Sequence, residues 1–205
     1  MTLDQYRDVA DRLLVPFVGA AKALGLTPDG VSVIAFAFAG AAGGAFAVAG
    51  GQGPLWLYLA ASVFVFANGW LDIVDGALAR ELGTDSEGGD LLDHVLDRYA
   101  DVLIIAGLAA SADAYALGLL AVTGVLLTSY LGTQIQAVGL GREYGGLLGR
   151  ADRLALVGVV GVVAFVVPGS IVAGLGAVEL LLVLFAVVGH FTALQRFWGA
   201  WSDLS

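Results

Sequence analysis

The chain has 205 residues, of which 59% are hydrophobic and only 13% are charged, and its mean hydropathy is +0.90. Soluble domains carry about a quarter charged residues, so this composition excludes an ordinary soluble protein and indicates a polytopic α-helical membrane protein. The chain has no cysteine, which excludes a disulfide framework and a thiolate metal site. The net charge of −9 fits equally an acidic rim that aids solubility or adaptation to high salt.

The first predicted element is an amphipathic helix over residues 3–24. Apolar residues such as Leu14 and Phe17 recur at helical spacing, and charged residues such as Asp11 and Arg12 fall between them. A segment of this kind directly before a membrane span is typical of a helix that lies in the membrane interface.

Six predicted membrane spans follow the interfacial helix and form a bundle over residues 31–195. Three connections between the spans are short and turn-like, which implies antiparallel neighbours. The fold class is therefore all-α and integral to the membrane, with one domain over residues 1–205. The predicted spans cover residues 31–49, 54–79, 90–111, 114–140, 152–167 and 170–195.

Basic residues predict the orientation of these spans. The three short turns near residues 51, 112 and 169 contain no Lys or Arg. Basic segments stay in the cytoplasm, so both termini and the loops near residues 85 and 146 are predicted to be cytoplasmic, in a multi-pass protein of the cell (plasma) membrane. The basic residues on that side are Arg7, Arg12, Lys22, Arg80, Arg142, Arg150, Arg153 and Arg196.

Four aspartates on two successive spans form the most informative pattern. Asp72 and Asp75 share a face near the cytoplasmic end of the second span. Asp93 and Asp97 lie four residues apart on the third span, and a turn between the spans brings the two stripes face to face. Asp101 continues the second stripe by one turn, either behind the site or paired with Arg98.

Grouped carboxylates near a membrane surface indicate a bound divalent cation. Ionisable groups at membrane depth are costly, and a cation removes the repulsion between them. Ligation by oxygen alone suits Mg²⁺, Mn²⁺ or Ca²⁺ rather than Zn²⁺. The alternative is a structural ion site or a wetted polar vestibule.

Other polar residues nearby are not assigned to the site. His94 and His190 do not fall on the stripe of aspartates, and Asp85, Glu87 and Asp90 are interpreted as solvated loop charges.

The same residues resemble the signature of the CDP-alcohol phosphotransferase family at all eight fixed positions. That family has an N-terminal interfacial helix and six spans, so the resemblance covers nearly the whole chain. It implies an enzyme of phospholipid biosynthesis that transfers a phosphatidyl or archaetidyl group from a CDP-activated lipid to a polar alcohol and releases CMP. The matching residues are Asp72, Asp75, Gly76, Ala79, Arg80, Gly89, Asp93 and Asp97.

The resemblance also implies a role for each position. The four aspartates would hold one or two Mg²⁺ or Mn²⁺ ions, and Asp97 would also be the general base for the acceptor hydroxyl. Arg80 would meet the donor phosphate as part of the catalytic set. The donor CDP group would lie against Asp75, Gly76, Ala79, Arg80 and Gly89.

Further positions resemble the branch that makes phosphatidylinositol phosphate and archaetidylinositol phosphate. Arg150 and Arg153 open the fifth span and Arg196 ends the sixth, and together they are predicted to hold a phosphate on the acceptor, such as inositol phosphate. The positive-inside rule explains the same arginines equally well. That branch usually has a Lys-x-Arg pair where this chain has Gly132 and Gln134, so glycerol phosphate and serine stay open as acceptors.

Two other classes compete with this hypothesis. A prenyltransferase also uses aspartate-rich motifs and Mg²⁺, but it would release pyrophosphate rather than CMP. A cation or proton transporter would use the carboxylates for transport, although transporter acids tend to lie near the bilayer midplane. The expected partners are the CDP-lipid, a small polar alcohol and the lipid bilayer, with no nucleic acid. A homodimer is compatible with the sequence, which leaves the oligomeric state open.

Overall fold

The computed structural model describes residues 7–51, 53–84, 86–141 and 148–204, with side chains from residue 13 onward. Residues 3–6 of the predicted interfacial helix, the loop residue Asp85 and the basic residue Arg142 lie outside this part, and the side chains of Arg7 and Arg12 are not described. The described chain is helical, apart from turns and one isolated antiparallel bridge between Val172 and Leu175.

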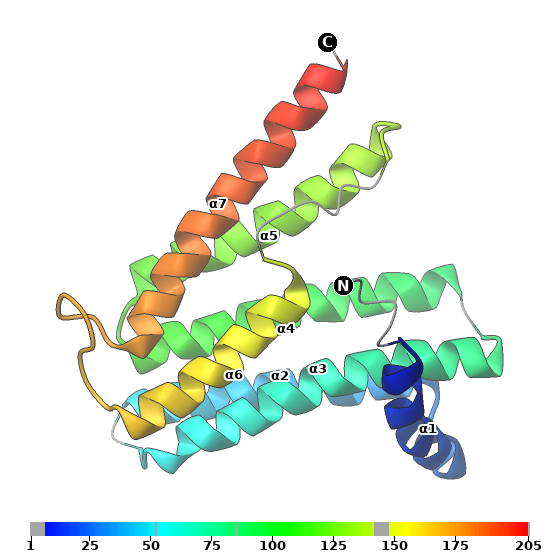
Figure 1. Ribbon diagram of the computed structural model, residues 1–205, viewed down its shortest axis with the longest axis horizontal. Coiled ribbons are helices and arrows are strands. Elements are labelled where there is room, and N and C mark those ends of the chain that lie inside the picture. Colours follow the sequence, from blue (N-terminus) through cyan, green and yellow to red (C-terminus); the bar gives the residue numbers. More distant parts are fainter. Residues whose placement is uncertain (1–6, 52, 85, 142–147, 205) are drawn as a thin grey trace.

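The described part of the chain contains seven α-helices, and six of them correspond to the predicted spans (Figure 1). The ends of the first five predicted spans agree with helix ends to within four residues. The helices are α1 (Arg7–Ala23), α2 (Pro28–Gly50), α3 (Trp56–Leu82), α4 (Glu87–Ser111), α5 (Tyr115–Ala137), α6 (Arg150–Val166) and α7 (Ala177–Leu204).

Four helices of the described chain, α2, α3, α5 and α7, are long and apolar enough to cross a membrane. The other two predicted spans fall short for different reasons. Helix α4 carries many charges in its first half, between Glu87 and Asp101. Helix α6 has only 17 residues, which corresponds to about 25 Å against a hydrocarbon core of about 30 Å. The prediction of an all-helical membrane protein is confirmed at this level.

The start and end of the last helix differ from the prediction. Helix α7 begins at Ala177 and ends at Leu204, whereas the predicted span covered residues 170–195. Pro168 precedes Gly169 and Gly174, which have φ angles of 118° and 82° that do not fit a helix. The turn after α6 therefore extends to residue 176. Apolar composition concealed this extension, because Ile171 and Val172 suit a membrane span as well as a turn.

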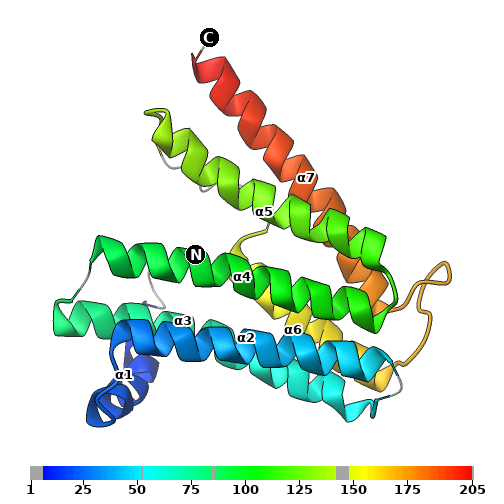
Figure 2. The ribbon, with the colours of Figure 1, turned by 180° about the vertical axis from the view of Figure 1, so that it is seen from behind.

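Helix α1 lies across one end of the bundle at a steep angle to α2 and α3 (Figures 1 and 2). Its buried residues Leu14 and Val18 pack in one cluster with Val74 and Leu78 of α3. Lys22, the only lysine of the sequence, forms an ion pair of 2.5 Å with Glu81. These contacts fix α1 to the same end of α3 that carries Asp72 and Asp75.

Close backbone contacts hold the helices in two groups. Helix α2 packs along both α3 and α4, and α5 packs along α7. A Cβ atom on Gly107 would collide with the backbone of Gly43, and one on Gly189 would collide with the backbone of Gly124, so only glycine allows these approaches. Figure 2 shows the α5–α7 pair diverging from α4 toward the C-terminal end of α7.

The connections gather at two ends of the molecule. The α2–α3, α4–α5 and α6–α7 connections lie together at the left of Figure 1. A single cavity lined by Gly50, Ser111, Pro168 and Gly176 joins them. Helix α1 and the turn between α3 and α4 lie at the opposite end (Figure 1). Arg80 and Gly89, which border the turn between α3 and α4, therefore lie at the end that carries α1.

Candidate metal and substrate site

Two helix ends bring the aspartates of α3 and α4 together. Gly83, with a φ of 63°, ends α3, and its backbone N–H donates to the carbonyls of the last helical turn. Ser86 caps α4, because its Oγ accepts a hydrogen bond of 3.0 Å from the Gly89 N–H. The chain thus reverses within a few residues, and carboxylate oxygens of Asp72, Asp75 and Asp93 lie within 4.8 Å of one another. Oxygen ligands at this spacing fit one divalent cation.

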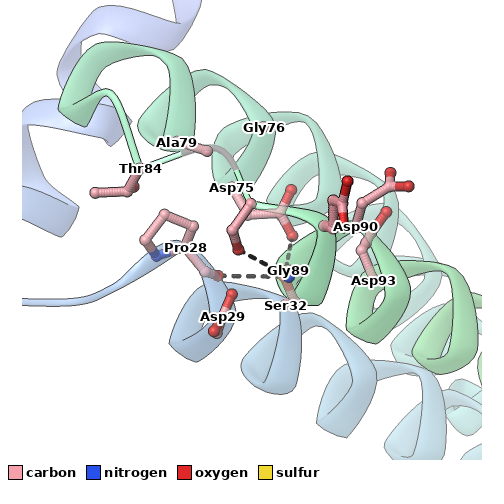
Figure 3. Close-up of a pocket in the computed structure, with 12 residues that line it drawn as sticks. Pro28, Asp29, Ser32, Asp75, Gly76, Ala79, Thr84, Gly89, Asp90 and Asp93 are labelled. Carbon is pink, nitrogen blue, oxygen red and sulfur yellow. Dashed lines mark hydrogen bonds between the residues drawn. The ribbon is translucent and has the colours of Figure 1, made fainter.

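Asp75 is the most buried member of this cluster, with 6% of its surface exposed. Its Oδ2 accepts a hydrogen bond of 2.6 Å from Ser32 Oγ on α2 (Figure 3). Ser32 was not among the predicted site residues. Its position one turn after Pro28, at the start of the helix that packs against both α3 and α4, could have indicated that it lies near the aspartates.

Asp97 stands apart from the three-carboxylate cluster. Its Oδ1 lies 2.6 Å from Arg150 Nη2, and its Oδ2 lies 3.4 Å from Arg98 Nη2. The other terminal nitrogen of Arg150, Nη1, lies 2.7 Å from Asp72 Oδ2. The guanidinium group of Arg150 therefore links Asp97 to the three-carboxylate cluster through Asp72. The prediction that Asp97 is itself a metal ligand stays a prediction.

A first cavity of about 470 Å³ opens on one side of the cluster, and Asp75 and Asp93 form part of its wall (Figure 3). Gly76, Ala79 and Gly89 line it as well, as expected for residues that leave room for a ligand. A Cβ atom on Gly89 would lie 3.2 Å from Ser86 Oγ and 3.3 Å from Asp29 Oδ1, so a side chain there would narrow the cavity.

Arg80 borders this cavity from outside. Its Nη1 would lie 3.4 Å from a Cβ atom on Gly76. The guanidinium therefore extends along the side of α3 that carries Gly76, which is called here the glycine face of α3. The side chain is exposed. An exposed guanidinium beside the cavity is able to reach an anion held there without a large movement of the backbone.

A second cavity of about 800 Å³ opens on the other side and is strongly basic. The predicted acceptor residues Arg150, Arg153 and Arg196 all line it, together with Asp97. A fourth basic residue, Arg98, also lines it and was missed from the sequence, where it was considered only as a partner of Asp101. The structure thus brings the three predicted arginines together and adds Arg98.

Most of these arginines are held by other side chains or by backbone. Arg153 Nη2 lies 3.0 Å from Asp101 Oδ2, and Arg196 Nη1 donates a hydrogen bond of 2.5 Å to the carbonyl of Thr128. Arg98 donates to Ser129 Oγ on α5. The arginines come from α4, α6 and α7, so the cavity is built where these helices and α5 meet.

A third space is an apolar groove of about 780 Å³ between α3 and α6. Residues such as Phe66 and Val159 line its length, while Asp72 and Arg150 lie at one end. Apolar side chains along the groove and charged groups at one end suit an amphipathic ligand. The three spaces therefore lie around the four aspartates, since Asp75 and Asp93 line the first, Asp97 lines the second and Asp72 lines the third.

The sequence of most of the chain matches one known family. A sequence model of CDP-alcohol phosphatidyltransferases matches residues 25–188, which covers α2 to α6 and most of α7. The chain belongs to the CDP-alcohol phosphatidyltransferase family. It is therefore an enzyme that transfers a phosphate-linked lipid group from a CDP-alcohol, as the signature predicted, and the prenyltransferase alternative is excluded.

Individual relatives of this CDP-alcohol phosphatidyltransferase narrow the comparison. The archaetidylinositol phosphate synthase of Methanothermobacter thermautotrophicus is 29% identical over 98% of this chain and 95% of its own length. The phosphatidylinositol phosphate synthase of Streptomyces avermitilis is 31% identical over 90% of this chain and 76% of its own length. The similarity thus lies with the branch that the sequence indicated.

Solved structures agree with this placement. The phosphatidylinositol phosphate synthase of Mycobacterium tuberculosis in complex with manganese and citrate superposes with a TM-score of 0.77, at 25% identity over 92% of this chain and 88% of that one. The same enzyme with CDP-DAG bound gives a TM-score of 0.73 at 26% identity, over 93% of this chain and 94% of that one. The manganese of the first structure and the carboxylate cluster of this chain confirm the prediction of a divalent metal cofactor.

Proposed function

We propose that this chain transfers a phosphatidyl or archaetidyl group from a CDP-activated lipid to inositol phosphate and releases CMP. The observation that carries the proposal is the arrangement of three spaces around the aspartates: a cavity beside the glycine face, an apolar groove and a basic cavity. Each space matches one part of the reaction in chemistry. The named relatives are synthases of archaetidylinositol phosphate and of phosphatidylinositol phosphate, which agrees with a basic acceptor cavity.

The donor would bind across the first cavity and the groove. Gly76, Ala79 and Gly89 leave room for the cytidine, and the exposed Arg80 holds a donor phosphate. The lipid chains extend along the groove between α3 and α6, with the diphosphate at the end that holds Asp72. Ser32 fixes the carboxylate of Asp75 between these parts through its hydrogen bond of 2.6 Å.

The metal site would consist of Asp72, Asp75 and Asp93, with Asp97 as a further ligand when the acceptor is in place. A bound Mg²⁺ or Mn²⁺ ion neutralises the donor diphosphate and the departing CMP. Arg150 holds Asp72 and Asp97 in a common arrangement through contacts of 2.7 and 2.6 Å. Because the two terminal nitrogens belong to one planar guanidinium group, they hold both carboxylates more firmly than a single contact would.

Asp97 would act as the general base. It lines the basic cavity, so its carboxylate is within reach of a hydroxyl group of an acceptor bound there. The acceptor oxygen attacks the phosphorus that carries the lipid, its proton passes to Asp97, and the bond from that phosphorus to the CMP oxygen breaks. Arg150, Arg153 and Arg196 hold the phosphate of the acceptor, which leaves one of its hydroxyl groups free for the attack.

The membrane arrangement follows from the same assignment. Six helices, α2 to α7, would cross the membrane, with the charged half of α4 at the cytoplasmic surface. Helix α1 would lie in the interface, because Leu13 and Phe17 are exposed while Leu14 and Val18 face the bundle. Both termini and the site would be cytoplasmic in the plasma membrane, in keeping with the positive-inside rule. A homodimer is compatible with this arrangement.

The acceptor is tested by a panel of alcohols with the purified enzyme and a CDP-lipid. Inositol phosphate should give the highest kcat/KM for CMP release, ahead of glycerol phosphate and serine. Gly132 and Gln134 supply no positive charge on α5, and this favours glycerol phosphate or serine as the second candidate. A preference for serine over both phosphorylated alcohols would refute the proposed acceptor. CDP-diacylglycerol and CDP-archaeol are compared in the same assay.

A further inference from the structure

Asp101 is a buried carboxylate that the proposed reaction does not use directly. It lies on α4 one turn beyond Asp97, and 5% of its surface is exposed. Its Oδ2 is shared by two guanidinium groups, at 3.0 Å from Arg153 Nη2 and at 3.4 Å from Arg98 Nη1. Both arginines line the basic cavity, whereas Asp101 lies behind its wall.

The contacts of Asp101 join two arginines from different helices. Arg98 belongs to α4 and Arg153 to α6, so their separation depends on the carboxylate between them. The same Nη1 of Arg98 also donates a hydrogen bond to Ser129 Oγ of α5, so α5 helps to hold this side chain beside Asp101. The Nε of Arg153 is buried and has no hydrogen-bond partner among the described residues.

The net charge around the cavity suits an anion. The cavity wall contains four arginines and Asp97, while Asp72 contacts Arg150 and Asp101 contacts Arg98 and Arg153, so these groups together carry a net charge of +1. A phosphate monoester carries a charge of about −1.5 to −2 at pH 7. Without Asp101 the same groups would carry +2, and two neighbouring guanidinium groups would repel each other.

We propose that Asp101 is a positioning residue that presents Arg98 and Arg153 as a pair to the phosphate of the acceptor. In this arrangement Arg98 supplies from α4 the positive charge that α5 lacks at Gly132 and Gln134. The proposal rests on the proposed function, because it requires a phosphorylated acceptor. It adds two residues, Asp101 and Arg98, to the recognition of that phosphate.

The test is the acceptor kinetics of Asp101→Asn in the full-length enzyme, with inositol phosphate as the varied substrate. The variant should raise the acceptor KM about tenfold or more, since bonds to charged groups are strong, and it should leave the KM for the CDP-lipid within about twofold. Asp101→Glu should recover part of the loss. Asp113→Asn, which removes the same charge from the distant α4–α5 turn, serves as the matched control. An unchanged acceptor KM in Asp101→Asn would overturn the proposal.

A second comparison covers the case in which Asp101→Asn does not fold. Arg153→Gln leaves Asp101 paired with Arg98, and the double variant Asp101→Asn/Arg153→Gln leaves neither of the two buried charges. The proposal predicts a higher acceptor KM in the double variant than in Arg153→Gln, because Arg98 then also loses its ion pair with Asp101. Equal values would refute it. Failure of the proposed function would be seen separately in the acceptor panel, where the wild-type enzyme would use only unphosphorylated alcohols.

Discussion

Arg150 Nη2 lies 2.6 Å from Asp97 Oδ1, so a residue predicted for the acceptor is ion-paired with the residue predicted to be the base. The same guanidinium reaches Asp72 at 2.7 Å. Arg150 therefore has a different environment from Arg153, whose partner Asp101 does not belong to the cluster of Asp72, Asp75 and Asp93. The two arginines open the same helix, yet their substitution should have different kinetic consequences.

Arg150→Ala should lower kcat by about tenfold or more, because Asp72 and Asp97 lose the group that holds them together. Arg150→Lys keeps the charge but not the two-pronged contact, so its kcat should be intermediate. Steady-state CMP release at saturating substrates measures both. If Arg150→Ala changes the acceptor KM and leaves kcat intact, Arg150 binds only the acceptor.

Arg153→Ala should raise the acceptor KM by about tenfold or more and leave the KM for the CDP-lipid nearly unchanged. Arg196→Ala should do the same, since Arg196 lines the same cavity. The KM values are measured with inositol phosphate and with each substrate varied in turn. If neither these variants nor Arg150→Ala alter the acceptor kinetics, the arginines are cytoplasmic anchors, and an unphosphorylated alcohol such as serine becomes the better candidate.

Asp97→Asn should reduce turnover by about 10²-fold or more while CDP-lipid binding persists, since an amide does not accept the proton. Asparagine keeps one ligating oxygen, and Asp72, Asp75 and Asp93 remain in place, so binding of Mn²⁺, followed by its electron paramagnetic resonance, should weaken little. Asp75→Asn is the contrasting variant and should weaken both Mn²⁺ and CDP-lipid binding. Wild-type turnover in Asp97→Asn would exclude this residue as the base.

Chelation should abolish activity, and added Mg²⁺ or Mn²⁺ should restore it. An ion that binds the folded protein also stabilises it, so the thermal midpoint in detergent should rise when Mn²⁺ is added to the chelated enzyme. Asp93→Asn should reduce that rise, because Asp93 belongs to the cluster. Full turnover in excess EDTA would contradict a metal-dependent reaction.

Arg80→Lys should impair donor use strongly, although it retains the positive charge. A guanidinium holds a phosphate by two parallel hydrogen bonds and an ammonium group does not. The expected result is an increase in the CDP-lipid KM, with the acceptor KM unchanged. Kinetics equal to those of the wild type would reduce Arg80 to a topological signal of the positive-inside rule.

The arrangement of the acidic helices followed from the sequence because local rules determine it. Gly83 ends α3 and Ser86 begins α4, so spacing along the chain was sufficient to predict that Asp72, Asp75 and Asp93 meet. The first turn of α7 was predicted wrongly, because Pro168 and Gly169 mark where a turn begins but not how long it runs.

Contacts between helices that are far apart in the sequence could not be predicted from such local rules. Ser32 reaches Asp75 across 43 positions of sequence, and Arg153 reaches Asp101 across 52. Neither pair has a spacing that identifies it, since their meeting depends on how whole helices pack. Arg98 was missed for the same reason, because its contact with Ser129 requires α4 and α5 to be neighbours.

The arrangement of three spaces around four aspartates has a consequence for product release. On the proposed assignment, the new phospholipid leaves sideways between α3 and α6 into the bilayer, whereas CMP leaves toward water past Gly76 and Gly89. Neither product has to pass through the space that the other occupies. A slow exit of the lipid would therefore leave the nucleotide cavity free to exchange, and CMP would compete with the incoming CDP-lipid rather than with the polar acceptor.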